Sequence, residues 1–294
     1  MKKTISFIAA GCLVLTLLAG CAPSASTTEP AATTEAANQT NTPETSTSPE
    51  TTLPTAESAT QAATEAAAAN EQEIIPVITG EQTQVHVSTA DEFLAALASD
   101  TEIILDAEMI DLSTSVGYGV KSTDTYYWFE EFDGPALYIT NLSNLTIRGG
   151  GESHDDNVIS AVPRYANVLN FENCSNIMVT GFTAGHAEEP GYCAGGVLRF
   201  LNCQEVLVQD CGLFGCGTLG VIGDSSKNMQ IVSNDIYDCS VGGVEFTNCE
   251  DVNIEGNTFR NLGTEEFPGL EIRVYGCVNI TRDGEPVHDF SPRY

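Results

Sequence analysis

Basic residues are scarce in this 294-residue sequence, which has 11 Lys and Arg against 41 Asp and Glu and a formal net charge of −30 at pH 7. A nucleic-acid partner needs clusters of Lys and Arg against its phosphates, so this composition argues against one. An anionic polysaccharide would also be repelled, unless bound Ca²⁺, which prefers oxygen ligands, bridged it to the protein. Paired CxxC spacings with nearby histidines are absent too, which argues against a zinc site.

The first 20 residues have the features of a secretory signal peptide. Two lysines precede an apolar run from Ile5 to Leu18, which is short for a membrane span. The sequence Leu18-Ala19-Gly20-Cys21 that ends this region resembles a bacterial lipobox. The resemblance implies that residues 1–20 are removed and that Cys21 carries lipid. We therefore expect a protein anchored to the cell membrane through Cys21 and facing the extracytoplasmic side.

Residues 22–73 lack nearly every side chain that could form a core. Apart from Leu53 they are Ala, Pro, Ser, Thr, Glu, Asn and Gln, a composition that cannot bury enough apolar area to offset the entropy of ordering. We expect residues 21–73 to be a disordered tether with a reach of about 40 Å if coil-like. Residues 74–294 then form one folded domain.

A repeat organises this domain. The dipeptide Asn-Cys, or a variant of it, ends at positions 174, 203, 226, 249 and 277, which gives steps of 29, 23, 23 and 28 residues. Apolar residues stand five and three places before this column and three and five places after it, which predicts two strands per repeat with apolar side chains facing inward. Leu213, Ile236 and Phe259 mark a third short strand. This pattern describes a parallel β-helix, since a propeller blade needs about 40 residues and a leucine-rich repeat has its own frame.

The repeat resembles that of the right-handed β-helix proteins of the pectate-lyase-like superfamily, over roughly residues 85–285. The predicted fold is therefore all-β, a right-handed parallel β-helix solenoid of about eight coils. Asn234 and Asn257 lie one period apart after the second strand, and they resemble the asparagine ladders of that superfamily. The column of Asn141, Asn173, Asn202 and Asn248 is a candidate for a second ladder.

A capping helix is expected at the N-terminal end of the solenoid, because an open end exposes strand edges. Ser88 or Thr89 is its predicted N-cap, with acids at Asp91 and Glu92. Its apolar face consists of Phe93, Leu94 and Leu97.

Seven of the eight cysteines after residue 73 fall into two columns of the repeat, Cys193, Cys216 and Cys239 in one and Cys174, Cys203, Cys249 and Cys277 in the other. Stacked strands are about 4.8 Å apart, but parallel side chains keep Cβ atoms farther apart than in a usual disulfide. The pattern favours stacks of buried thiols, with disulfides as the alternative for an exported protein.

Four insertions interrupt the repeat, and we expect all four at the turn before the first strand: residues 113–134, 152–157, 185–196 and 263–269. In the superfamily that the repeat resembles, long loops at this turn and the outward face of the next strand form the substrate cleft. That outward column is predicted to contain Tyr138, Asn170, Arg199, Ile222, Glu245 and Arg273, with Glu271 beside it.

Aromatic rings beside acids and arginines are what a sugar-binding groove needs. The predicted ligand-binding residues are therefore Trp128, Tyr138, Asn170, Glu189, Tyr192 and Glu271. A lyase would use Arg199 or Arg273 as its base, with Ca²⁺ held by Glu245 and Glu271.

A hydrolase would instead need two carboxyl groups about 5–9.5 Å apart, for which Glu245 and Glu271 on adjacent coils are candidates. His186 is a candidate general base in either reaction. The calcium and acid–histidine motifs of the superfamily's enzymes are not found in the sequence. The sequence therefore predicts a surface lipoprotein that binds or processes polysaccharide, with a noncatalytic scaffold or protein-interaction module as the alternative.

Overall fold

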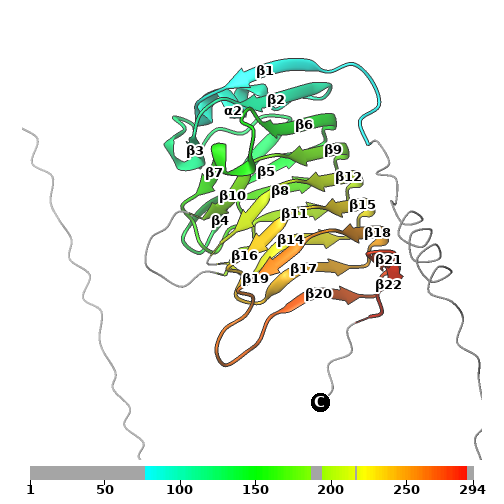
Figure 1. Ribbon diagram of the computed structural model, residues 1–294. Coiled ribbons are helices and arrows are strands. Elements are labelled where there is room, and N and C mark those ends of the chain that lie inside the picture. The colour runs from blue at the N-terminus through cyan, green and yellow to red at the C-terminus, as the bar shows by residue number, and fades with distance from the viewer. Residues whose placement is uncertain (1–76, 187–193, 216, 290–294) are drawn as a thin grey trace, which may run out of the picture. The chain divides into compact units, whose positions relative to one another are not determined.

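The computed structural model describes residues 77–186, 194–215 and 217–289 (Figure 1). The predicted signal peptide, the predicted lipidation site Cys21 and the predicted tether lie outside these residues, as do Glu189, Tyr192, Cys193 and Cys216. Among the described residues, no helix is long and apolar enough to cross a membrane.

The described chain forms a parallel β-helix with three sheets, and each regular coil contributes one strand to sheet A, one to sheet B and one to sheet C (Figure 1). Strand pairing within the sheets is parallel except between β4 and β5 and between β21 and β22. Sheet A stacks eight parallel strands from β1 to β21, which matches the predicted number of about eight levels, and β22 closes its end.

The elements have the following bounds. Sheet A contains β1 (Thr83–Val87), β2 (Thr101–Leu105), β6 (Ser143–Gly149), β9 (Ser175–Thr180), β12 (Gln204–Gln209), β15 (Lys227–Val232), β18 (Glu250–Glu255), β21 (Val278–Arg282) and β22 (Glu285–Pro286). Sheet B contains β3 (Met109–Asp111), β7 (Val158–Ala161), β10 (Thr183–His186), β13 (Gly212–Phe214), β16 (Asp235–Tyr237) and β19 (Thr258–Arg260). Sheet C contains β4 (Tyr126–Glu131), β5 (Gly134–Thr140), β8 (Leu169–Glu172), β11 (Leu198–Leu201), β14 (Leu219–Asp224), β17 (Gly242–Thr247) and β20 (Leu270–Tyr275). The helices are α2 (Ala90–Ala96) and the short 3₁₀ helices η1 (Leu112–Thr114) and η2 (His154–Asp156).

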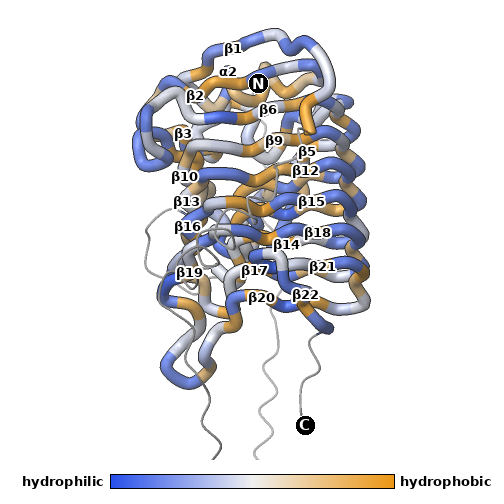
Figure 2. The backbone as a smooth tube through the Cα atoms, turned by 45° about the vertical axis from the view of Figure 1, so that its right-hand side comes forward, coloured by the Kyte–Doolittle hydropathy of each residue, from blue (hydrophilic) through white to orange (hydrophobic). Residues whose placement is uncertain are grey.

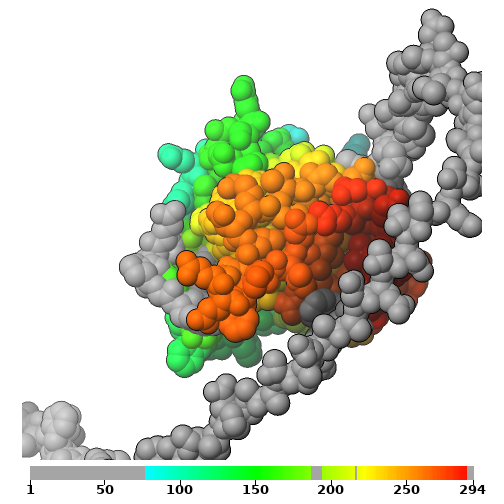
Figure 3. All heavy atoms as spheres, turned by 60° about the horizontal axis from the view of Figure 1, so that its bottom comes forward, coloured from blue at the N-terminus to red at the C-terminus, as the bar shows by residue number. Residues whose placement is uncertain are grey.

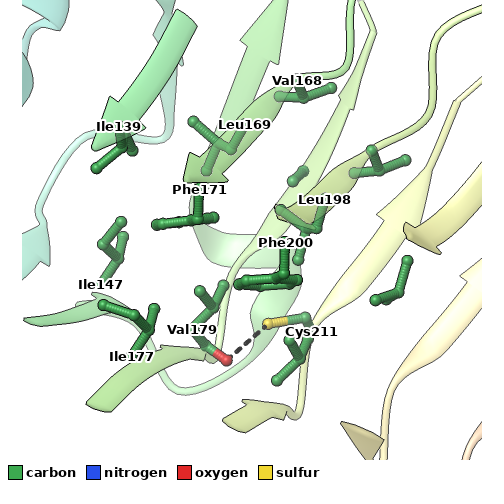
Figure 4. Packing of buried hydrophobic residues seen from close by; sticks show 14 of the residues in the cluster. Ile139, Ile147, Val168, Leu169, Phe171, Ile177, Val179, Leu198, Phe200 and Cys211 are labelled. Atoms are coloured by element: carbon green, nitrogen blue, oxygen red, sulfur yellow. Dashed lines mark hydrogen bonds between the residues drawn. The ribbon is translucent and has the colours of Figure 1, made fainter. Parts of the chain in front are cut away.

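The core consists of stacked apolar columns, as the repeat predicts. In sheet C, Phe171 pairs in register with Phe200, and their rings stack with centroids 5.0 Å apart and planes 8° apart. Figure 4 shows these rings between Leu169, Leu198 and Val179 inside the solenoid. The corners beside β12, β15 and β18 are hydrophilic, whereas hydrophobic segments run along the strands (Figure 2). Alternation therefore fills the interior with apolar side chains at every level.

The helix α2 covers the N-terminal end, and its capping is as predicted. The Thr89 hydroxyl accepts a hydrogen bond from the Glu92 backbone N–H at 3.2 Å, and the Glu92 carboxylate accepts one from the Ser88 N–H at 2.8 Å. These two bonds satisfy backbone donors at the start of α2. Phe93, Leu94 and Leu97 are buried, so the predicted apolar face is confirmed.

Asparagines organise the corners. The Asn234 side-chain amide donates to the Asn257 carbonyl at 2.9 Å, and Asn257 in turn donates to the Ile231 carbonyl at 2.6 Å, so the predicted ladder is confirmed. In the second predicted column the residues adopt left-handed backbone, for example φ 55° at Asn173 and 52° at Asn202, which asparagine tolerates better than most residues. A side-chain hydrogen bond of 2.6 Å joins this pair.

The described cysteines are free thiols: Cys174, Cys203, Cys211, Cys239, Cys249 and Cys277. All except the half-buried Cys277 are buried. Burial raises the pKa of Cys211 and of Cys239 to about 12. The interpretation of these residues as packed thiols is therefore confirmed for the described residues.

Three of the four insertions lie where they were predicted. Residues 113–134 lie between β3 and β5 and residues 263–269 between β19 and β20, and the described flanks of the 185–196 insertion are β10 and β11, so all three are at the turn from sheet B to sheet C. Residues 152–157 contradict the prediction, because they lie between β6 and β7, at the turn from sheet A to sheet B. The prediction failed because the next strand after this insertion is the short strand β7 of sheet B, and not a strand of sheet C. In Figure 3 the last coil and the loop before β20 form the end of the solenoid opposite α2.

Candidate functional site

The outward surface of sheet C, called the C face below, has two neighbouring columns of side chains. The first column is in the predicted register, Tyr138, Asn170, Arg199, Ile222, Glu245 and Arg273. The second lies two residues farther along each strand and contains Thr140, Glu172, Leu201, Asp224, Thr247 and Tyr275. Because side chains alternate along a strand, both columns point away from the core.

Aromatic rings gather at the N-terminal end of the C face. The antiparallel pairing of β4 with β5 sets Tyr127 opposite Tyr138, and their rings stack with centroids 5.0 Å apart and planes 13° apart. Phe129, which is 53% exposed, meets Tyr138 edge to face with centroids 6.1 Å apart. The Tyr127 hydroxyl donates to the Glu172 carboxylate at 2.7 Å. Burial, then this hydrogen bond, raises the pKa of Tyr127.

Two arginine–carboxylate ion pairs lie on the rest of the C face. Arg199 lies near Tyr138, and its nearest guanidinium nitrogen is 3.7 Å from the Asp224 carboxylate. Arg273 lies 3.3 Å from the Glu245 carboxylate and also donates to the Tyr275 hydroxyl at 2.8 Å. The C face is therefore an aromatic patch followed by a row of arginine–carboxylate pairs.

Glu271 is exposed beside the first column, as predicted, but it is engaged from the neighbouring sheet. Its carboxylate lies 2.6 Å from the guanidinium of Arg282 on β21. Glu245 and Glu271, the two acids suggested for a calcium site or a carboxyl pair, are thus each held by an arginine. No three His, Cys, Asp or Glu side chains gather closely enough to hold a metal ion within the described residues. The residues present at the C face do not fit a calcium site.

Asn170 is in the predicted column but does not reach the surface, since it is 1% exposed. Its amide donates to the Leu137 carbonyl at 3.0 Å and accepts from Asn167 at 2.8 Å. These contacts remove Asn170 from the predicted ligand-binding residues, because its polar atoms stabilise the sheet itself.

Trp128 is also not placed as the ligand-binding residue that was predicted. On β4 it pairs with Leu137, whose side chain faces the core, and its ring packs against the core and against Tyr118 with centroids 5.0 Å apart. Its indole nitrogen is buried and has no hydrogen-bond partner among the described residues. The neighbours Tyr127 and Phe129 are the aromatic residues that face outward.

His186 does not join the arginines. It ends β10 in sheet B, is 2% exposed, and its Nε2 lies 2.8 Å from the Ala166 carbonyl. Burial lowers the pKa of His186. His186 therefore lies apart from Arg199, Glu245 and Arg273, because its ring is buried at the end of a sheet B strand.

The comparisons with known proteins agree with this architecture. The profile of the family described as "Right handed beta helix region" matches residues 125–284, more than half of the chain. The chain belongs to the right-handed β-helix family. No curated protein sequence matches it.

Among solved structures, the chain is similar to a proposed glycosyl hydrolase from Parabacteroides merdae at 12% identity and a TM-score of 0.39, over 69% of this chain and 99% of that one. It is also similar to a pectate lyase from Paenibacillus sp. at 10% identity and a TM-score of 0.33, over 61% of this chain and 62% of that one. A pectate lyase variant from Xanthomonas campestris gives 13% identity and a TM-score of 0.32, over 74% of this chain and 83% of that one.

Sequence reasoning missed three residues of the C face: Phe129 on the hairpin strand and Glu172 and Asp224 in the second column. The signal for all three was the alternation that located the first column. Two residues farther along each strand, it gives Glu172 and Asp224, and within β4 it gives Phe129 as the outward-facing residue after Tyr127.

Proposed function

We propose that this protein binds a polysaccharide through the C face and does so from an anchor on the cell membrane. The observation that carries the proposal is the aromatic patch, in which the stacked pair of Tyr127 and Tyr138 and the exposed ring of Phe129 lie next to Arg199. Sugar rings have apolar faces that pack on aromatic rings, and their hydroxyls need charged or polar hydrogen-bond partners close by.

Recognition without turnover is the version that the geometry favours. A lyase base has to accept a proton, and both Arg199 and Arg273 are instead engaged by carboxylates, Asp224 and Glu245. A carboxylate neighbour stabilises the protonated guanidinium. His186 is buried in sheet B, so the arginines and the histidine suggested as proton acceptors are either paired with carboxylates or buried.

The proposal is tested with the soluble chain from Ala22 onward on a panel of immobilised polysaccharides. The variants Phe129→Ala and Tyr138→Ala should each weaken binding by about fivefold, since one ring contact contributes on the order of 1 kcal/mol. Tyr237→Ala is the matched control, because Tyr237 is a half-buried aromatic residue on the outward side of sheet B. An equal loss of binding in the control, or an affinity that is unchanged in all three variants, would refute the C face as the binding site.

Turnover is measured in the same samples. We expect no growth of ultraviolet absorbance from unsaturated uronate products and no new reducing ends. Product formation that is lost in Arg199→Ala or Arg273→Ala would show that the protein is an enzyme and would contradict binding without turnover. Absence of binding to every polysaccharide would favour the alternative of a scaffold for protein partners.

Membrane anchoring is supported by the sequence before the folded domain, with its basic start, apolar run and Cys21. In cells producing the whole chain, we expect the protein in the membrane fraction, labelled by a radioactive fatty acid. Cys21→Ala should abolish the label and release the protein from the membrane. A labelled Cys21→Ala variant would contradict lipidation at this residue.

A further inference from the structure

We infer that the polysaccharide recognised by the C face is uncharged. This inference rests on the proposed function and adds the chemical class of the ligand. It is argued from the way the charged groups of the face are already paired.

On the C face, acidic side chains outnumber the arginines that could bind an acidic sugar. Its two columns contain two basic residues, Arg199 and Arg273, against three acidic ones, Glu172, Asp224 and Glu245. Each arginine already lies within 3.7 Å of a carboxylate. A uronate that bound either arginine would lie beside the carboxylate that is already paired with it. Like charges at such separations repel by about 1–4 kcal/mol.

The aromatic end of the face is also close to negative charge. Glu172 accepts the hydrogen bond from Tyr127, and Glu131 is among the charges that act on Tyr138. Burial first, and then nearby acids, raise the pKa of Tyr138. An acidic sugar that stacked on this patch would therefore lie close to carboxylates, Glu172 among them.

A neutral sugar can form hydrogen bonds with these carboxylates and arginines without disturbing their ion pairs. A carboxylate offers about four lone-pair positions and a guanidinium five N–H donors. The Tyr127 hydroxyl occupies one position on Glu172, and Asp224 is held by Arg199 and by the Ser225 hydroxyl at 2.9 Å. Sugar hydroxyls can thus donate to these carboxylates and accept from Arg199 while the ion pairs persist.

The test uses the soluble chain from Ala22 onward with three kinds of probe: neutral galactan, xylan and glucan, polygalacturonate with Ca²⁺ or with a chelator, and cationic chitosan. We expect a neutral polysaccharide to bind, with an affinity that changes less than about twofold between 50 and 300 mM NaCl, because no net charge is neutralised. Polygalacturonate should not bind under either condition. Chitosan that binds through the overall negative charge should be released by salt, and its affinity should be the same for the Tyr138→Ala variant.

A charge-relief variant makes the inference sharper. The triple variant Glu172→Gln, Asp224→Asn and Glu245→Gln removes the three negative charges of the two columns and should bring polygalacturonate binding at least about tenfold above that of the unchanged protein. The single change Asp224→Asn is the milder version should the triple variant fold poorly. Asp235→Asn is the matched control, since it frees Arg260 on sheet B and should bring no gain.

The outcomes separate the two claims. Polygalacturonate binding by the unchanged protein that is as tight as neutral binding and is weakened by Tyr138→Ala would overturn the inference and keep the proposed function. Chitosan binding that depends on Tyr138 would also overturn it. Absence of binding to every probe would refute the proposed function itself.

Discussion

The asparagine ladder allows a stability prediction to be worked out from its contacts. Asn234 is 1% exposed and lies at the corner between β15 and β16. Its side-chain oxygen accepts from the Cys211 N–H at 3.0 Å, and its amide donates to the Val208 carbonyl and to Asn257, both at 2.9 Å. Asn234→Ala removes all three bonds at once.

The magnitude follows from the groups that are left behind. The Cys211 N–H and the Val208 carbonyl would lose a buried partner that water cannot easily replace, and each such group costs about 1–3 kcal/mol. Asn257 keeps the backbone N–H of residue 234 as a donor, at 2.9 Å, so its loss is smaller. We expect Asn234→Ala to lower the free energy of unfolding by about 2–5 kcal/mol, and Tm by about 5–20 °C for a domain of this size.

Urea titration followed by circular dichroism on the chain from Ala22 onward measures this change. Asn253→Ala is the matched control, because Asn253 is half-buried and its partners Glu255 and Thr281 can turn toward water. The control should cost less than about 1 kcal/mol. Equal losses in the two variants, or a loss below about 1 kcal/mol for Asn234→Ala, would refute the reasoning from unsatisfied buried groups.

Three further predictions follow from the core. Phe200→Ala should lower the free energy of unfolding by about 3–5 kcal/mol, measured in the same titration, because the ring is fully buried and stacks on Phe171. Cys211 and Cys239, whose pKa burial raises to about 12, should react with a thiol reagent only after unfolding, and rapid labelling in the native state, followed by mass spectrometry, would contradict their packing. His186 is buried and its pKa is lowered, so the unfolded chain binds its proton first as pH falls below about 6.5. Stability should therefore fall between pH 7 and the lowered pKa, and the slope should be shallower in His186→Gln; an unchanged slope would exclude this histidine as the cause.

The repeat made the fold predictable because each coil has to satisfy the same constraints. An inward position in one coil, such as Phe171, is stacked on the inward position of the next, such as Phe200, so the apolar columns of the sequence are the columns of the structure. The corner residues Asn234 and Asn257 repeat for the same reason, since each coil has to turn at the same place.

The candidate site was predictable only in part, because register gives the direction of a side chain and not what lies over it. Asn170 points outward by alternation, yet Asn167 and the edge of β5 bury it. For Trp128 the sequence did not show the antiparallel hairpin of β4 with β5, which turns this ring toward the core and its neighbours outward. His186 looked like a loop residue because β10 is short and lacks large apolar side chains.

The most direct test of the account is hydroxyl-radical footprinting of the chain from Ala22 onward, with and without a saturating neutral polysaccharide that binds it. The account predicts that Phe129 and Tyr138 become protected on binding, while Tyr237 on sheet B keeps its reactivity. Protection of Tyr237 with no change at Phe129 and Tyr138 would place the ligand elsewhere and contradict the C face as the binding site.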